Sequence, residues 1–79
     1  MTGPTQRLDL RGLDPPEPMR LALEAVEALA PGAAVELLTD REPLLLHREL
    51  GLRRHAFDYE SCAEGFRTTV HRGGEAGAR

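Results

Sequence analysis

The stretch Leu8–Pro18, LDLRGLDPPEP, decides the fold that this sequence predicts. Residues 6–10 alternate polar and apolar side chains, which predicts a short strand with Leu8 and Leu10 facing the core. The loop after this strand contains Gly12, which makes it flexible at that position. The chain is therefore expected to begin with a strand that leads through a loop into a helix.

The helix after this loop is indicated by capping signals and by apolar periodicity. Asp14 and Glu17 have the spacing of a capping box, and the nearby prolines suit a first helical turn, where a missing N–H costs little. Pro31 and Gly32 are expected to end the helix. Its apolar stripe consists of Met19, Ala22, Leu23, Val26, Leu29 and Ala30. Arg20, Glu24 and Glu27 are expected to face outward.

The middle of the chain repeats the strand–helix pattern. Residues 33–39 predict a second strand, with Val35 and Leu37 on one face and Glu36 on the other. Asp40 is expected to cap a second helix that opens at Pro43 and ends at Gly51 in a left-handed cap. Leu46 and Leu50 mark the inner face of this helix. Leu44 and Leu45 cannot both face inward with them, so at least one is expected in solvent or on a contact surface.

The remainder predicts a β-hairpin and completes the fold. Residues 53–59 and 65–72 alternate in polarity, and residues 60–64 are expected to form the turn between them. The first two strands should be parallel by the right-handed crossover rule, with both helices on one face of the sheet. The predicted fold is an α/β two-layer sandwich of order β-α-β-α-β-β, in which two helices cover one face of a four-stranded mixed sheet. The other face is expected to stay open and polar.

Length and composition limit the classes of function. A chain of 79 residues forms one domain, residues 1–79, and we expect it to be ordered over residues 6–72 with frayed ends at 1–5 and 73–79. Its net charge of −3 argues against a nucleic-acid-binding protein. No apolar run approaches the roughly 20 residues that span a membrane, and the N-terminus has no signal-peptide pattern. A cytoplasmic location is expected.

The opening stretch resembles the TusA/SirA family, in which a strand runs into Gly-Leu-x-Cys-Pro-x-Pro. Gly12, Leu13, Pro16 and Pro18 match this motif, and Pro15 stands where the family has its sulfur-carrier cysteine. The resemblance extends from Leu8 to about residue 72. It implies a setting in sulfur or redox metabolism and docking onto larger proteins. Because proline has no nucleophile, it also implies that sulfur relay by the family's route is excluded.

The chain is still more similar to an uncharacterised sister family that lacks the carrier cysteine. Members of that family open with Arg-Gly-x-x-Pro-Pro and carry an Asp-His-Asp-Pro turn after the second strand. Here the turn reads Asp40-Arg41-Glu42-Pro43, so arginine replaces the histidine and glutamate replaces the second aspartate. A metal or proton-transfer role for that histidine has no counterpart in this chain.

The candidate site lies where the two parallel strands end. In open α/β sheets ligands bind at the carboxyl ends of the strands, and both predicted helix starts lie there with free N–H groups that favour anions. The candidate residues for binding a protein partner or a small anion are Arg11, Asp14, Glu17, Asp40, Arg41 and Glu42. The alternative is that these residues only cap the helices and pair with one another.

The remaining reactive residues favour a binding role over catalysis. Cys62 is the only cysteine, which rules out an internal disulfide and leaves no paired thiols for zinc. It is the candidate sulfur carrier of an alternative function, although Glu60 and Glu64 beside it disfavour a reactive thiolate. We expect no cofactor and no metal, a protein partner, and a monomer or weak dimer. The leading hypothesis is a non-enzymatic accessory module, and the alternative is a divergent sulfur carrier or sulfurtransferase that uses Cys62.

Overall fold

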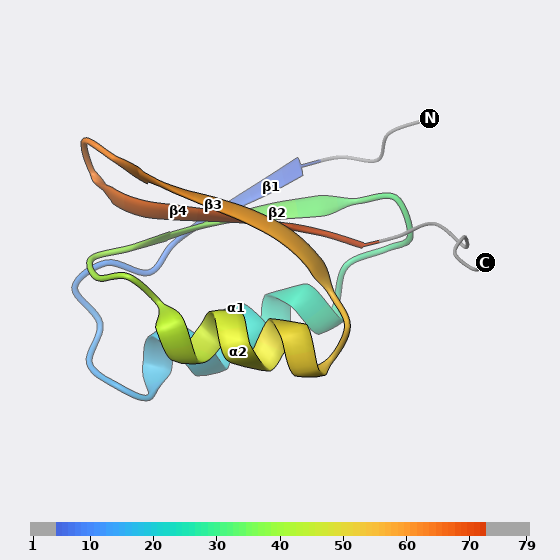
Figure 1. Ribbon diagram of the computed structural model, residues 1–79, viewed down its shortest axis with the longest axis horizontal. Helices are drawn as coiled ribbons and strands as arrows, with labels where there is room; N and C mark the ends of the chain where they lie inside the picture. Colours follow the sequence, from blue (N-terminus) through green and yellow to red (C-terminus); the bar gives the residue numbers. More distant parts are fainter. Residues whose placement is uncertain (1–4, 73–79) are drawn as a thin grey trace.

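Two strand–helix units followed by a β-hairpin make up the chain (Figure 1). The computed structural model describes residues 5–72, so the predicted frayed ends at 1–4 and 73–79 lie outside the described residues, and Thr5 is part of the first strand. The elements are β1 (Thr5–Asp9), α1 (Glu17–Glu27), β2 (Ala34–Thr39), α2 (Leu44–Leu52), β3 (Ala56–Cys62) and β4 (Gly65–His71). The predicted order of strands and helices is confirmed.

The four strands form one mixed sheet in the order β1-β2-β4-β3. β1 and β2 are parallel, as the crossover rule predicts, and β4 lies antiparallel between β2 and β3. Both helices lie against the same face of the sheet, below it in Figure 1. The two-layer α/β sandwich expected from the sequence is therefore confirmed. No helix among residues 5–72 has the length and apolar character to cross a membrane.

The core fills the space between the helices and the sheet. Val35 and Leu37 of β2 are fully buried beside Val70 of β4, which confirms the predicted inner face of the second strand. The helices contribute their predicted inner residues, Ala22, Val26, Leu46 and Leu50. Burial of each large aliphatic side chain contributes about 1.5–3 kcal/mol. The prediction for Ala30 is wrong: it is exposed, because α1 ends at Glu27 and Ala30 lies in the turn beyond it.

The face of the sheet away from the helices is polar, as predicted. Arg7 of β1 pairs with Glu36 of β2, with 3.3 Å between Nε and Oε1. Across the hairpin, Arg67 pairs with Glu60, with 2.9 Å between Nη1 and Oε2. These ion pairs join neighbouring strands on a surface that is open to solvent, so each one contributes little to the free energy of folding.

The second helix ends differently from the prediction. Gly51 lies inside α2, and the residue with left-handed backbone is Arg54, whose φ is 63°. The N–H of Arg54 donates to the Gly51 carbonyl (3.0 Å), and the N–H of His55 donates to the Leu50 carbonyl (2.9 Å). This pair of bonds is a Schellman motif. The helix continues past its glycine because Leu50 is fully buried and holds this last turn against the core.

The hairpin is shifted along the chain relative to the prediction. Residues 53–55 terminate α2, so β3 begins only at Ala56 and runs to Cys62, and the turn has two residues, 63 and 64, rather than five. Cys62 is therefore the last residue of a strand and is partly buried, not exposed in a turn. Because β3 is an edge strand, Tyr59 is 47% exposed.

Candidate functional site

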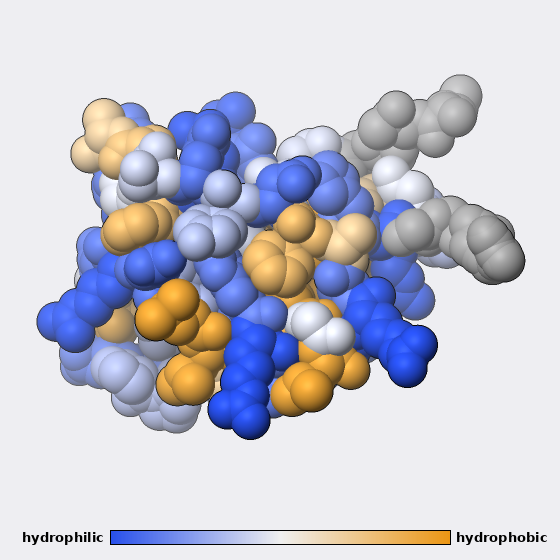
Figure 2. All heavy atoms as spheres, in the orientation of Figure 1, coloured by the Kyte–Doolittle hydropathy of each residue, from blue (hydrophilic) through white to orange (hydrophobic). Residues whose placement is uncertain are grey.

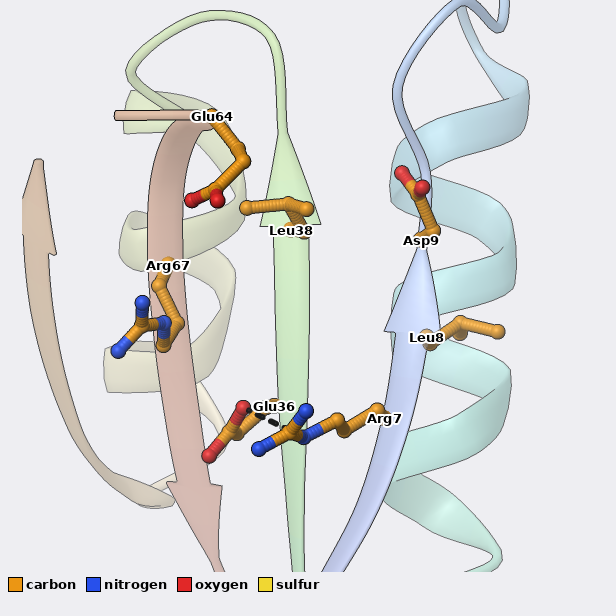
Figure 3. Close-up of a pocket in the computed structure, with 7 residues that line it drawn as sticks. All are labelled: Arg7, Leu8, Asp9, Glu36, Leu38, Glu64 and Arg67. Atoms are coloured by element: carbon orange, nitrogen blue, oxygen red, sulfur yellow. Dashed lines mark ion pairs between the residues drawn. The ribbon is translucent and has the colours of Figure 1, made fainter. Parts of the chain in front are cut away.

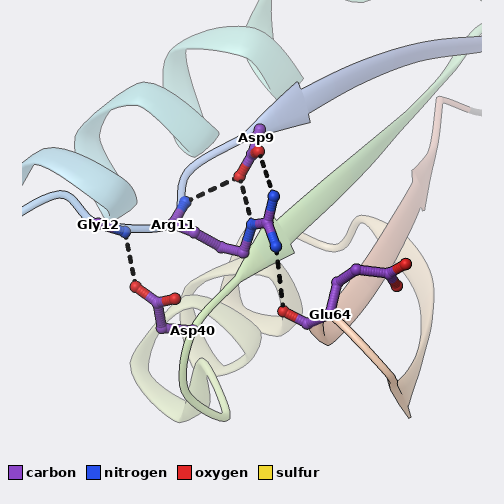
Figure 4. A network of polar contacts seen from close by, with 5 residues as sticks. All are labelled: Asp9, Arg11, Gly12, Asp40 and Glu64. Atoms are coloured by element: carbon purple, nitrogen blue, oxygen red, sulfur yellow. Dashed lines mark hydrogen bonds and ion pairs between the residues drawn. The ribbon is translucent and has the colours of Figure 1, made fainter.

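The loops after β1 and β2 lie at the same end of the molecule because the two strands are parallel. A single hydrogen bond links them: the backbone N–H of Gly12 donates to Oδ2 of Asp40, 2.6 Å away (Figure 4). The prediction that Asp40 caps α2 is wrong, because Pro43 occupies the N-cap position and no side chain bonds to the first turn. Asp40 instead joins two segments that are far apart in the sequence.

Arg11 is held by a carboxylate two residues before it. Its Nε and Nη2 donate to Oδ1 and Oδ2 of Asp9 at 2.9 and 2.8 Å, and its backbone N–H donates to Oδ1 at 3.1 Å (Figure 4). These hydrogen bonds lower the pKa of Asp9 to about 2 and raise the pKa of Arg11. Arg11 Nη1 also lies 3.5 Å from the Glu64 carbonyl oxygen in the hairpin turn. The charge of Arg11 is thus largely neutralised, and the paired N–H donors of its guanidinium are already hydrogen-bonded to Asp9.

The predicted capping box at the start of α1 is not formed. A capping box needs its two residues at the N-cap and N3 positions, but Pro16 is the N-cap and Glu17 is the first helical residue. Asp14 therefore lies before the helix. Only its backbone carbonyl bonds to the start of α1, by accepting the Glu17 N–H at 2.9 Å. The carboxylate of Glu17 pairs with Arg20, and this lowers the pKa of Glu17.

Arg41 and Glu42 lie side by side in sequence but differ in their contacts. Glu42 Oε2 accepts a hydrogen bond from the hydroxyl of Tyr59 at 3.0 Å, and this raises the pKa of Tyr59. Arg41 is exposed, and its guanidinium makes no ion pair with another residue in the described part of the chain. The structure therefore brings Asp40 to the first loop and ties Glu42 to β3, while Arg41 extends into solvent.

A polar groove of about 340 Å³ runs over the open face of the sheet beside this loop pair (Figure 3). Its charged residues are two bases and three acids: Arg7, Arg67, Asp9, Glu36 and Glu64. Two leucines, Leu8 and Leu38, complete its lining. Because acids outnumber bases in the groove, it offers no net attraction for an anion.

A polar and aromatic cluster surrounds His47. Nε2 of His47 and Oγ1 of the fully buried Thr68 lie 2.8 Å apart. The ring stacks on Phe57 (4.8 Å between centroids) and lies against Tyr59 (4.3 Å). The available signal was the i, i+2 spacing of the two aromatic residues on one face of a strand.

The His47 cluster predicts a pH dependence of stability. Burial lowers the pKa of His47 below its usual 6.5, and Glu42 opposes the shift. Below the unfolded pKa the unfolded chain binds a proton that the folded chain does not, so the free energy of unfolding should decrease as the pH falls through about 6.5. We expect His47→Gln to flatten this part of the profile, measured by urea denaturation at several pH values. If the free energy of unfolding of His47→Gln depends on pH just as steeply, the proton is bound by another group.

Among residues 5–72, no three or more histidine, cysteine or acidic side chains are placed to hold a metal ion. Cys62 lies at the end of β3, opposite Gly65 in the register of the hairpin.

Comparison with known proteins assigns the chain to a family. No curated protein and no solved structure matches it. A family model described as "Uncharacterized conserved protein (DUF2249)" matches residues 7–72, a span that runs from β1 to the residue after β4 and includes both loops of the candidate site. The chain is therefore a member of the DUF2249 family.

Proposed function

We propose that this protein is a non-enzymatic accessory module that docks a protein partner through the β2–α2 loop and the exposed side of α2. The observation that carries this proposal is the exposure of three leucines in one short helix: Leu44 (63%), Leu45 (69%) and Leu52 (67%). Figure 2 shows hydrophobic side chains gathered along the part of the molecule where α2 lies. Single exposed leucines are ordinary, but a group of them indicates an interaction surface.

The charges beside these leucines define the chemistry of the partner. Arg41 precedes α2 and Arg48 lies within it, one turn after Leu44 and Leu45. Both arginines are exposed, and neither forms an ion pair within residues 5–72. A partner with an apolar surface flanked by carboxylates would complement this arrangement. Burial of the exposed parts of Leu44 and Leu45 alone would contribute about 2–4 kcal/mol before the costs of association.

A protein partner has better support than a small anion at the loop pair. Asp9 already holds the guanidinium of Arg11, and Asp40 already accepts the Gly12 N–H, so an anion would have to displace two carboxylates. The resemblance of the opening stretch to TusA/SirA proteins suggests that the partner belongs to sulfur or redox metabolism. That setting is part of the proposal.

The proposal is tested by site-specific photo-cross-linking in cell lysate. A photoreactive amino acid replaces Leu45 in one variant and, as a control, Glu24 on the exposed side of α1 in another. We expect one protein to be cross-linked from position 45 and not from position 24, with a yield that falls at high salt and in an Arg48→Glu background. The proposal fails if Arg48→Glu and salt leave the yield unchanged, or if the cross-linked protein is a second copy of this chain.

The alternative function, sulfur transfer by Cys62, stays a prediction and has a direct measurement. The thiol lies at the end of β3, and Glu60 and Glu64 are its charged neighbours in sequence. We expect no change in the intact mass of the protein after incubation with a polysulfide donor and a sulfurtransferase. A gain of one sulfur atom that reductant removes, and that Cys62→Ser abolishes, would favour the carrier function over the accessory module.

A further inference from the structure

A second hollow lies at the end of the molecule opposite the loop pair, beside the ends of α1 and α2. In Figure 1 these two helix ends are on the right. Its volume is about 520 Å³, within the range of small-molecule sites. It is formed by the end of α1, the α2–β3 connection and the end of β4. Its titratable lining residues are Glu27, Arg53, Arg54, His55, His71 and Arg72.

The positive charge of this hollow is only partly compensated. Arg53 lies between two carboxylates, with Nη1 3.1 Å from Glu27 and Nε 3.1 Å from Glu49. Glu27 also lies 3.5 Å from Nε2 of His55. The carboxylates near the hollow are thus engaged, and neither Arg54 nor Arg72 forms an ion pair with any residue between 5 and 72.

Both of these arginines are fixed at the backbone. Arg72 donates its N–H to the Ala33 carbonyl and accepts the Gly32 N–H, each at 2.9 Å. Arg54 is held in the Schellman motif with a φ of 63°, a left-handed conformation in which glycine is the usual residue. An arginine there carries a conformational cost that glycine would not, and such strain is concentrated at functional sites.

An arginine at the end of a helix also complements the helix dipole, so that role must be separated from ligand binding. The last carbonyls of α2 are already occupied: those of Glu49, Leu50 and Gly51 accept the N–H groups of residues 53, 55 and 54. The dipole explains why a cation is tolerated at this helix end. It does not explain why Arg72, which is far from α2 in sequence, lines the same hollow.

We propose that this hollow binds the phosphate group of a small molecule through Arg54 and Arg72. Guanidinium groups match the oxygens of a phosphate with paired N–H donors, and two of them balance a doubly charged phosphate. The hollow is large enough for the remainder of such a molecule beside the phosphate. The inference is independent of the proposed docking function, because the two surfaces share no residue.

The experiment titrates the ¹⁵N-labelled protein with pyrophosphate at constant ionic strength and follows the backbone amide signals. We expect shifts at residues 53–56, 71 and 72, and affinity about tenfold weaker in both Arg54→Gly and Arg72→Gln. Arg20→Gln removes an arginine outside the hollow and outside the docking surface, and should bind pyrophosphate like the unmodified protein. Arg54→Gly should also melt at a higher temperature, since glycine relieves the backbone, so its weaker binding cannot result from unfolding.

Two further ligands complete the experiment. One distinguishes a soluble phosphate compound from a lipid headgroup, and the other tests whether the hollow binds an acidic peptide instead. Vesicles containing phosphatidate should leave these amides unchanged if the phosphate belongs to a soluble molecule, and shift them if it belongs to a lipid headgroup. The proposal is overturned if pyrophosphate and vesicles both leave the amides unchanged, or if Arg54→Gly binds as tightly as the unmodified protein. It is also overturned if a polyglutamate peptide binds in the hollow and neither phosphate ligand does.

Discussion

Replacement of Gly65 by alanine is expected to unfold a large fraction of the protein at room temperature. Gly65 begins β4 with a φ of 142°, a conformation essentially confined to glycine, and a Cβ there would collide with the backbone carbonyl oxygen of Thr39. Thr39 is the last residue of β2, is buried and pairs with Phe66 of β4, so its carbonyl cannot move away without disturbing this end of the sheet. We expect a loss of about 3 kcal/mol or more in the free energy of unfolding, measured by urea denaturation followed by circular dichroism. A core of this size supplies only about 3–5 kcal/mol.

The matched control is the same substitution at Gly51. This glycine lies inside α2, and a Cβ built on it meets nothing within 4 Å. Alanine is a better helix former than glycine, so Gly51→Ala should stabilise the protein by about 0.5–1 kcal/mol. Equal effects of the two substitutions would contradict the assignment of Gly65 to a strained, crowded position.

The second large effect is expected from Leu50→Ala. Leu50 is fully buried on the inner face of α2, so truncation removes apolar contacts and leaves a cavity between the helix and the sheet. Such substitutions cost about 2–5 kcal/mol, which approaches the whole stability of a domain this small. The expected result is a transition shifted to much lower urea concentration with little change in its slope.

Leu52 provides the control for this experiment in the same helix. Its side chain is 67% exposed, so Leu52→Ala should change the free energy of unfolding by no more than about 0.5 kcal/mol. A loss comparable with that of Leu50→Ala would mean that Leu52 is buried in solution. Sedimentation of the unmodified protein would then show whether self-association buries it.

Periodic features of the fold could be predicted from the sequence. The alternation around Val35 and Leu37 and the helical spacing of Ala22 and Val26 identified residues that are now found in the core. These patterns repeat over several turns or residues, so a local exception does not hide them. The parallel pairing of β1 and β2 followed from a general rule of chain handedness.

The ends of the elements could not be predicted in the same way. The glycine at position 51 suggested a helix end, but burial of Leu50 outweighs that local preference and moves the left-handed residue to Arg54. The same shift displaced the start of β3. Helix ends depend on one or two residues whose preferences tertiary packing can override.

The contacts of the candidate site could not be predicted from sequence patterns either. The bond between Gly12 and Asp40 joins residues 28 apart in sequence, and Arg11 pairs with Asp9, two residues before it. The hollow that contains Arg54 and Arg72 combines segments that carry no common motif. Sequence reasoning identified charged loops correctly, but only the fold shows which of their charges are already paired.

The position of β4 between β2 and β3 has a consequence for synthesis of the domain on the ribosome. A nascent chain that ends at Ala63 contains β1, β2 and β3 but lacks the strand that hydrogen-bonds to both β2 and β3. Pairing of β2 with β4 also joins residues as distant as Ala34 and His71, and such long-range contacts form slowly. Until β4 has emerged, the core between the helices and β2 lacks Val70, and β2 and β3 lack the strand that pairs with both. During that interval the chain is most exposed to aggregation and to chaperones.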